Sequence, residues 1–134
     1  MAVVRDDLRR VSSSEDVVAV RQVVREWAVA SGFSLVDQTK MVTAASELAR
    51  NVVLYGGGGT VRLEALNDGM KRGLRLVFED QGPGIADVEK ALRDGFTTGS
   101  GLGLGLGGAR RLVNEFSIQS APGRGTRIEI TRWK

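Results

Sequence analysis

The 134-residue chain has no cysteine and no histidine. The lack of cysteine excludes disulfides and thiolate metal sites. The lack of histidine excludes imidazole ligands, Ser-His-Asp systems and any phosphohistidine intermediate on this chain. Catalysis must therefore depend on carboxylate, amide, hydroxyl, lysine or arginine side chains, or on the backbone.

Aromatic residues are scarce at 5%, and the 19 basic residues are dispersed among 16 acidic ones. A net charge of +3 without a basic, aromatic-rich patch does not favour nucleic-acid binding. No apolar run approaches the roughly 18 residues of a membrane span, and the N-terminus lacks the apolar segment of a secretory signal. We expect one globular domain over residues 1–134, located in the cytoplasm and independent of membranes and nucleic acid.

The spacing of apolar residues predicts both helices and strands. Helices are expected over about 14–31, where Ser12 to Glu15 has capping-box spacing, then from Ser34 to the glycines at 56–59, and over about 107–114. Alternation at period two predicts strands over 60–66, 73–79, 116–120 and 126–132. Turn-forming residues between them predict that the first two strands form one hairpin and the last two a second. This order predicts an α+β two-layer sandwich, with helices on one face of a mostly antiparallel, mixed sheet.

Glycine is the one residue in marked excess, with 18 copies. Fifteen of them fall within positions 56–59, 82–84, 95–108 and 123–125, between ordinary apolar segments. Low-complexity disorder would spread them evenly. Each cluster therefore indicates a specific turn or ligand-binding loop.

Three short motifs could carry chemistry. Glu47 and Asn51 lie four residues apart, hence on one face of the second predicted helix, although a surface hydrogen-bonded pair would look the same. Asp80 begins Asp-Gln-Gly-Pro-Gly at the end of an apolar strand, where either a ligand contact or a plain turn would fit.

The third motif is the glycine-rich run over 101–108, which leads into a predicted helix and so suits a phosphate. Gly103, Gly105 and Gly108 satisfy the dinucleotide-binding spacing, but no apolar strand precedes them, and no Gly-Lys-Ser/Thr exists for a Walker A loop. The run predicts phosphate binding without either of those folds.

In order, Ser46 to Asn51, Asp80 to Ile85, Gly101 to Gly105 and Gly125-Thr126 resemble the N, G1 and G2 boxes and the closing Gly-Thr of GHKL (Bergerat-fold) ATP-binding proteins. The resemblance runs from about residue 35 to the end. Within that superfamily the chain is similar to the anti-sigma-factor serine/threonine kinases. It implies ATP and Mg²⁺ as cofactors.

The resemblance also implies residue roles. Glu47 would be the general base and Asn51 the ligand of Mg²⁺. Asp80 would accept a hydrogen bond from the adenine amino group, with Thr126 in support. The implied glycine contacts are Gly82 and Gly84 around the base, and Gly101, Gly103 and Gly105 over the phosphates. Arg50, Arg110 and Arg111 could contact phosphate or partner, but surface arginines are commonly solvated.

Because the chain has no histidine to phosphorylate, the phosphate acceptor must lie in another molecule. The resemblance implies a Ser or Thr of a STAS-domain antagonist in a stressosome-type stress-response pathway, and a PP2C-type phosphatase that the released kinase activates. Two other functions remain open: an anti-sigma factor that sequesters a sigma subunit, and an ATP-gated binding module without protein kinase activity.

Overall fold

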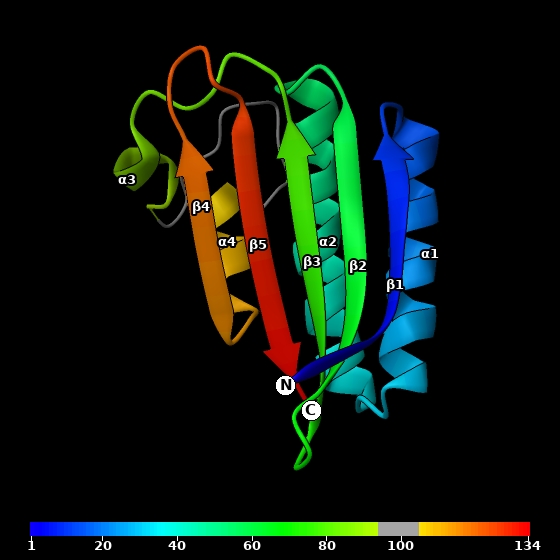
Figure 1. The fold of residues 1–134 in the computed structure, drawn as a ribbon. Coiled ribbons are helices and arrows are strands. Elements are labelled where there is room, and N and C mark those ends of the chain that lie inside the picture. The colour runs from blue at the N-terminus through cyan, green and yellow to red at the C-terminus, as the bar shows by residue number, and fades with distance from the viewer. Residues whose placement is uncertain (94–104) are drawn as a thin grey trace.

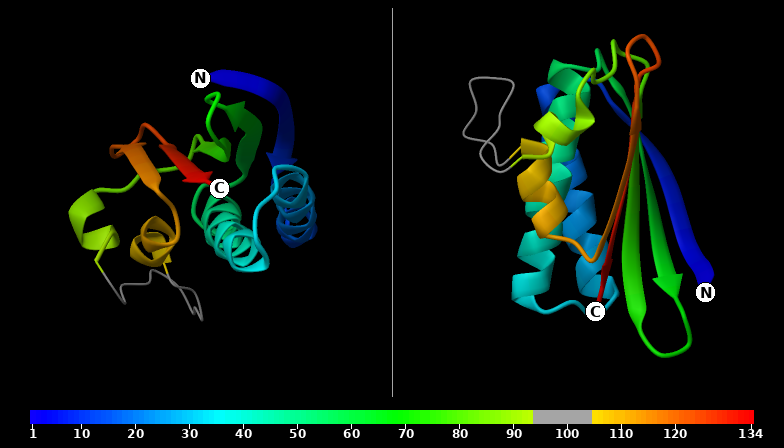
Figure 2. Two further views of the ribbon diagram at one scale, coloured as in Figure 1. Left: turned by 90° about the horizontal axis from the view of Figure 1, so that it is seen from below. Right: turned by 90° about the vertical axis from the view of Figure 1, so that its left-hand side faces the viewer.

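The computed structural model describes residues 1–93 and 105–134. Its five strands form one sheet in the order β1-β2-β3-β5-β4, and the helices lie on one face of it (Figures 1 and 2). The elements are β1 (Ala2–Val11), α1 (Ser14–Ala30), α2 (Leu35–Leu54), β2 (Gly59–Asn67), β3 (Arg72–Asp80), α3 (Val88–Ala91), α4 (Gly105–Arg111), β4 (Glu115–Ser120) and β5 (Thr126–Trp133). The predicted α+β sandwich is confirmed. Within the described ranges all strand pairings are antiparallel, so the parallel pair that a mixed sheet would contain is not found there.

Serine caps begin both long helices. The Ser34 hydroxyl accepts from the Asp37 amide at 3.1 Å at the start of α2. At α1 the cap is Ser13, one residue later than the predicted capping box, and its hydroxyl accepts from the Asp16 amide at 3.2 Å. The Asp16 carboxylate accepts in return from the Ser12 amide at 2.9 Å. These bonds satisfy amides that have no partner within the helix.

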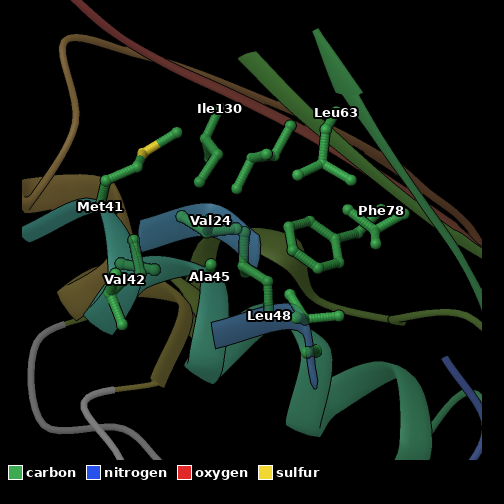
Figure 3. Close-up of a cluster of buried hydrophobic side chains, with 14 of the residues drawn as sticks. Val24, Met41, Val42, Ala45, Leu48, Leu63, Phe78 and Ile130 are labelled. Atoms are coloured by element: carbon green, nitrogen blue, oxygen red, sulfur yellow. The ribbon is translucent and has the colours of Figure 1, made fainter. Parts of the chain in front are cut away.

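The core fills the space between the helices and the sheet (Figure 3). Figure 3 shows Leu63, Phe78 and Ile130 from the sheet opposite Met41 and Leu48 from α2. All five side chains are at most 1% exposed. Strand residues alternate between the two faces of the sheet. Polar residues at the strand ends that lie two positions from a core residue therefore also face the helices.

Two elements were not predicted from the sequence. β1 is an edge strand paired with β2 alone, with a register shift between Val3 and Arg5 and only Val11 buried. An edge strand without a buried face has no clear alternation to detect. The other element, α3, is only four residues long. No helix in the described ranges is long and apolar enough to span a membrane.

Arg132 joins three elements at the end of the sheet away from Asp80. Its Nη2 donates to Asp37 Oδ1 of α2 at 2.6 Å, and its Nη1 donates to the Leu112 carbonyl, just after α4, at 2.8 Å. The side chains of Arg132 and Asp37 are 14% and 26% exposed, respectively. The hydrogen bond from Arg132 is the main cause that holds the pKa of Asp37 below its ordinary 3.8.

We expect Asp37→Asn to lower the free energy of unfolding at pH 7 by about 1.5–3 kcal/mol, the range for a hydrogen bond to a charged group. Because the pKa of Asp37 is lower in the folded state, its stabilisation is complete above about pH 4 and is lost as the pH falls through the folded value. The gap between wild type and variant should therefore close in denaturant unfolding below pH 3.8. As a control, Asp6→Asn removes an exposed pair with Arg62 at 3.9 Å and should cost only a few tenths of a kcal/mol. A gap for Asp37→Asn that is constant with pH would contradict the assignment.

Candidate functional site

Three polar side chains meet at the ends of three neighbouring strands. Asp80 of β3 is the register partner of Thr126 of β5, which in turn pairs with Ser120 of β4. Phe78 lies two residues before Asp80 on β3, and Ile128 lies two residues after Thr126 on β5; both are buried in the core between the layers. The three polar side chains therefore point to the helical side of the sheet.

Hydrogen bonds fix the geometry of this corner. Asp80 Oδ1 accepts from the Gly82 amide at 2.9 Å, which shapes the turn after β3. Ser120 Oγ accepts from the Ile85 amide at 2.8 Å, donates to the Gly125 carbonyl at 3.0 Å and lies 2.8 Å from Thr126 Oγ1. Ser120 was not among the predicted site residues. Its place opposite Thr126 in the predicted hairpin was the available signal.

Glycines allow the backbone segments around Asp80 to approach closely. A Cβ on Gly82 would lie 2.7 Å from Gly56 Cα, just after α2, and a Cβ on Gly56 would lie 2.4 Å from Asp80 Cγ. A Cβ on Gly84 would lie 2.0 Å from the Ala121 carbonyl oxygen. Side chains at these positions would separate α2, the segment after β3 and the β4–β5 turn. Glycine at these positions therefore lets the three segments pack together, and the contact of Gly82 and Gly84 with a base stays a prediction.

Glu47 and Asn51 lie on α2, the helix that ends at this corner. Both are half-buried, next to Leu48 and Val52 of the core. Glu47 Oε1 is 3.8 Å from a guanidinium nitrogen of Arg50, a loose ion pair that is too long for a hydrogen bond. Glu47 and Asn51 thus lie on the helix next to Asp80. Among the described residues, no hydrogen bond or ion pair joins either of them to Asp80.

The glycine-rich run is only partly described. Gly101 and Gly103 lie outside the described residues, as does most of the segment expected to cover the phosphates. Gly105 begins α4 with a φ of +69°, and α4 runs beside α2 (Figures 1 and 2). Arg110 and Arg111 are exposed near the end of α4.

A hollow of about 300 Å³ opens at the same end of the sheet. Its lining includes Asp80, Ser120 and Thr126, but also Glu79 and Arg127, which alternate to the face away from the helices. The hollow thus wraps around the strand ends. It does not by itself mark where a ligand would lie between sheet and α2.

The described residues contain no group of three or more acidic side chains that could hold a metal. A single amide oxygen from Asn51 would still suit Mg²⁺, because this ion keeps several waters and is commonly held through substrate phosphates.

Residues 36–134 match the family described as histidine kinase-, DNA gyrase B- and HSP90-like ATPase. The chain belongs to this ATPase family. The match runs from the second residue of α2 through the corner at Asp80 and α4 to the end of the chain, and the family implies ATP as the nucleotide.

This ATPase is 48% identical over 124 residues to serine/threonine-protein kinase RsbT of Bacillus subtilis (strain 168), covering 92% of this chain and 93% of RsbT. An anti-sigma F factor of Thermoanaerobacter sp. (strain X514) is 28% identical over 133 residues, covering 95% of this chain and 92% of that protein. A crystal structure of the RsbU and RsbW domains of a Mycobacterium tuberculosis protein superposes with a TM-score of 0.64, at 23% identity, over 96% of this chain and 33% of that one. The structural likeness concerns the fold, whereas the identity to RsbT identifies the ATPase as a protein serine/threonine kinase. Both the family prediction and the enzyme prediction are confirmed.

Proposed function

We propose that this kinase transfers the γ-phosphate of Mg²⁺-bound ATP to a Ser or Thr of a STAS-domain antagonist protein, and that the released kinase activates a PP2C-type phosphatase. The observation that carries the proposal is the junction of α2 with the Asp80 corner. The helix that carries Glu47 and Asn51 ends beside Asp80, as the close approach of Gly56 shows, and Asp80 and Thr126 offer hydrogen-bonding groups there. A nucleotide could span from one set to the other.

In this arrangement Asp80 and Thr126 bind the adenine, while Gly82 and Gly84 keep the backbone close around it. Asn51 supplies an oxygen for Mg²⁺, which neutralises charge on the phosphates when bound. Gly105 belongs to the phosphate side, together with Gly101 and Gly103. The sequence motifs support all of these roles, and the corner geometry adds support only for those of Asp80, Thr126, Gly82 and Gly84.

Glu47 acts as the general base in the transfer. Its carboxylate takes the proton of the acceptor hydroxyl as that oxygen attacks the γ-phosphorus. The bond from the γ-phosphorus to the bridging oxygen breaks, and ADP leaves with its electron pair. Glu47 is half-buried beside Leu48, which partly shields its carboxylate from bulk water.

The function is tested by incubating the full chain with Mg²⁺ and ATP labelled on the γ-phosphate, together with the STAS proteins of the same cell. We expect label on a STAS Ser or Thr. If the label appears only in inorganic phosphate, the protein hydrolyses ATP without transferring phosphate to a STAS protein, and the proposed substrate is wrong. We also propose that the protein lies in the cytoplasm, which cell fractionation tests, and that residues 1–134 form one domain.

An anti-sigma factor is the second candidate, because an anti-sigma F factor aligns over 95% of this chain. Pull-down against a sigma subunit and a STAS protein, each with ATP present, separates the two functions. Retention of the STAS protein alone supports the kinase that we propose.

We expect Asp80→Asn to weaken ATP binding about 10- to 100-fold while the protein stays folded. A hydrogen bond to a charged acceptor is worth about 1.5–3 kcal/mol, and the amide replaces one acceptor oxygen with a donor. The remaining oxygen can still accept from the Gly82 amide, so the turn is kept. Calorimetric titration with Mg²⁺-ATP measures the affinity, and the melting temperature provides the control. Unchanged affinity would show that Asp80 does not bind the base.

A further inference from the structure

Ser120 has three hydrogen-bonding partners for one hydroxyl group. The Ile85 amide can only donate and lies at 2.8 Å, whereas the Gly125 carbonyl can only accept and lies at 3.0 Å. A serine hydroxyl has one proton and two lone pairs. With its proton on Gly125 and one lone pair filled by Ile85, it can only accept from Thr126 Oγ1, 2.8 Å away.

The opposite direction would leave a buried group without a partner. If Ser120 donated to Thr126, the carbonyl of the buried Gly125 would lose its bond to Ser120. An unsatisfied buried acceptor costs its full desolvation penalty, so the first arrangement is favoured. The Thr126 hydroxyl therefore donates its hydrogen bond to Ser120 Oγ, and it offers a ligand only lone pairs.

Asp80 also offers only lone pairs, since a carboxylate has no proton to donate. It lies directly across the sheet register from Thr126 and on the same face, and its Oδ1 is already bonded to the Gly82 amide. Two neighbouring acceptors suit an exocyclic amino group, as on carbon 6 of adenine. They repel the oxygen that guanine carries at that position.

We propose that Ser120 is a positioning residue that determines base selectivity: by fixing the Thr126 hydroxyl as an acceptor, it makes the corner prefer adenine over guanine nucleotides. The inference rests on the proposed nucleotide site. It adds a third side chain, two strands away from Asp80 in the sheet, that acts through Thr126 without contacting the base.

The test compares the dissociation constants of ATP and GTP, each with Mg²⁺, for wild type, Ser120→Ala and Ser120→Thr. In Ser120→Ala the Thr126 hydroxyl is free to rotate and donate to the guanine oxygen, so the preference for ATP should fall about 10-fold or more. Ser120→Thr keeps the hydroxyl and should keep the preference. A purely structural role would weaken both nucleotides equally, and an unchanged ratio in Ser120→Ala overturns the inference.

Ser120→Ala also leaves the Ile85 amide and the Gly125 carbonyl without this partner, so it could unfold. Thr126→Val then provides the test, because it removes only the hydroxyl at issue and keeps the other two bonds of Ser120. We expect the same fall in preference, and an unchanged ratio would overturn the inference. If wild type fails to bind ATP, the proposed function fails as well. Wild-type ATP binding with an unchanged ratio in the variants removes the selectivity inference alone.

Discussion

Glu47→Gln should lower phosphate transfer to the protein substrate by about 10²- to 10⁴-fold, the usual loss when a general base is removed. Glutamine keeps the size of the side chain and one acceptor oxygen but cannot take the hydroxyl proton. ATP affinity should stay near the wild-type value, because the base acts on the acceptor hydroxyl and not on the nucleotide. Calorimetry with Mg²⁺-ATP and a single-turnover assay with labelled γ-phosphate measure the two quantities on the same preparation.

Asn51→Ala is the matched control on the same helix face. It removes the oxygen proposed for Mg²⁺, so ATP affinity and transfer should fall together. If Glu47 and Asn51 were only surface partners at i and i+4, either substitution would cost a few tenths of a kcal/mol of stability and leave transfer intact. Near-normal transfer by Glu47→Gln would remove Glu47 as the base.

The sequence predicted the long helices and both hairpins because several local signals agreed. For α2, the Ser34 cap, the apolar spacing and the glycines after Tyr55 all pointed to the same bounds, and the helix runs over Leu35–Leu54. For β1 no such agreement existed. Its pairing with β2 depends on the rest of the sheet, since nine of its ten residues are not buried.

The site was predictable as an ordered set of motifs but not as a geometry. The motifs identified Asp80 and Thr126 separately, and only the β3–β5 register makes them neighbours. Ser120 has no unusual sequence context, and its three partners come from two segments, Ile85 after β3 and Gly125-Thr126 at the start of β5. Arg132 was likewise predicted only as a strand residue, although it bonds to α2 and to the residue after α4.

Close approach of backbone segments is the feature of this site that depends most on residue type. Gly84 has a φ of +77°, and an added Cβ would lie 2.0 Å from the Ala121 carbonyl oxygen. The atom that the Cβ would meet belongs to the backbone, so no flexible side chain can move aside. The Ser120–Ile85 hydrogen bond is formed next to this contact, and it holds the segment after β3 against the β4–β5 turn.

Gly84→Ala should therefore lower the free energy of unfolding by about 4 kcal/mol or more. The positive φ alone costs a residue with a Cβ about 1–2 kcal/mol, and the remainder comes from separating two packed backbone segments. At roughly 3 °C per kcal/mol for a chain of this size, the melting temperature should fall by about 12 °C. ATP affinity, measured by calorimetry below the melting temperature of the variant, should fall as well because the segment that follows Asp80 is displaced.

Gly123→Ala is the matched control, since Gly123 has a φ of +76° and nothing within 4 Å of an added Cβ. It carries the same backbone strain without the collision, so it should cost only about 1–2 kcal/mol and about 3–6 °C. The difference between the two variants measures the close approach itself. Equal losses in the two proteins would mean that the segment at Gly84 moves away from Ala121 at little cost. The close approach of Gly84 to Ala121 would then not be what holds Asp80 in place beside the end of α2.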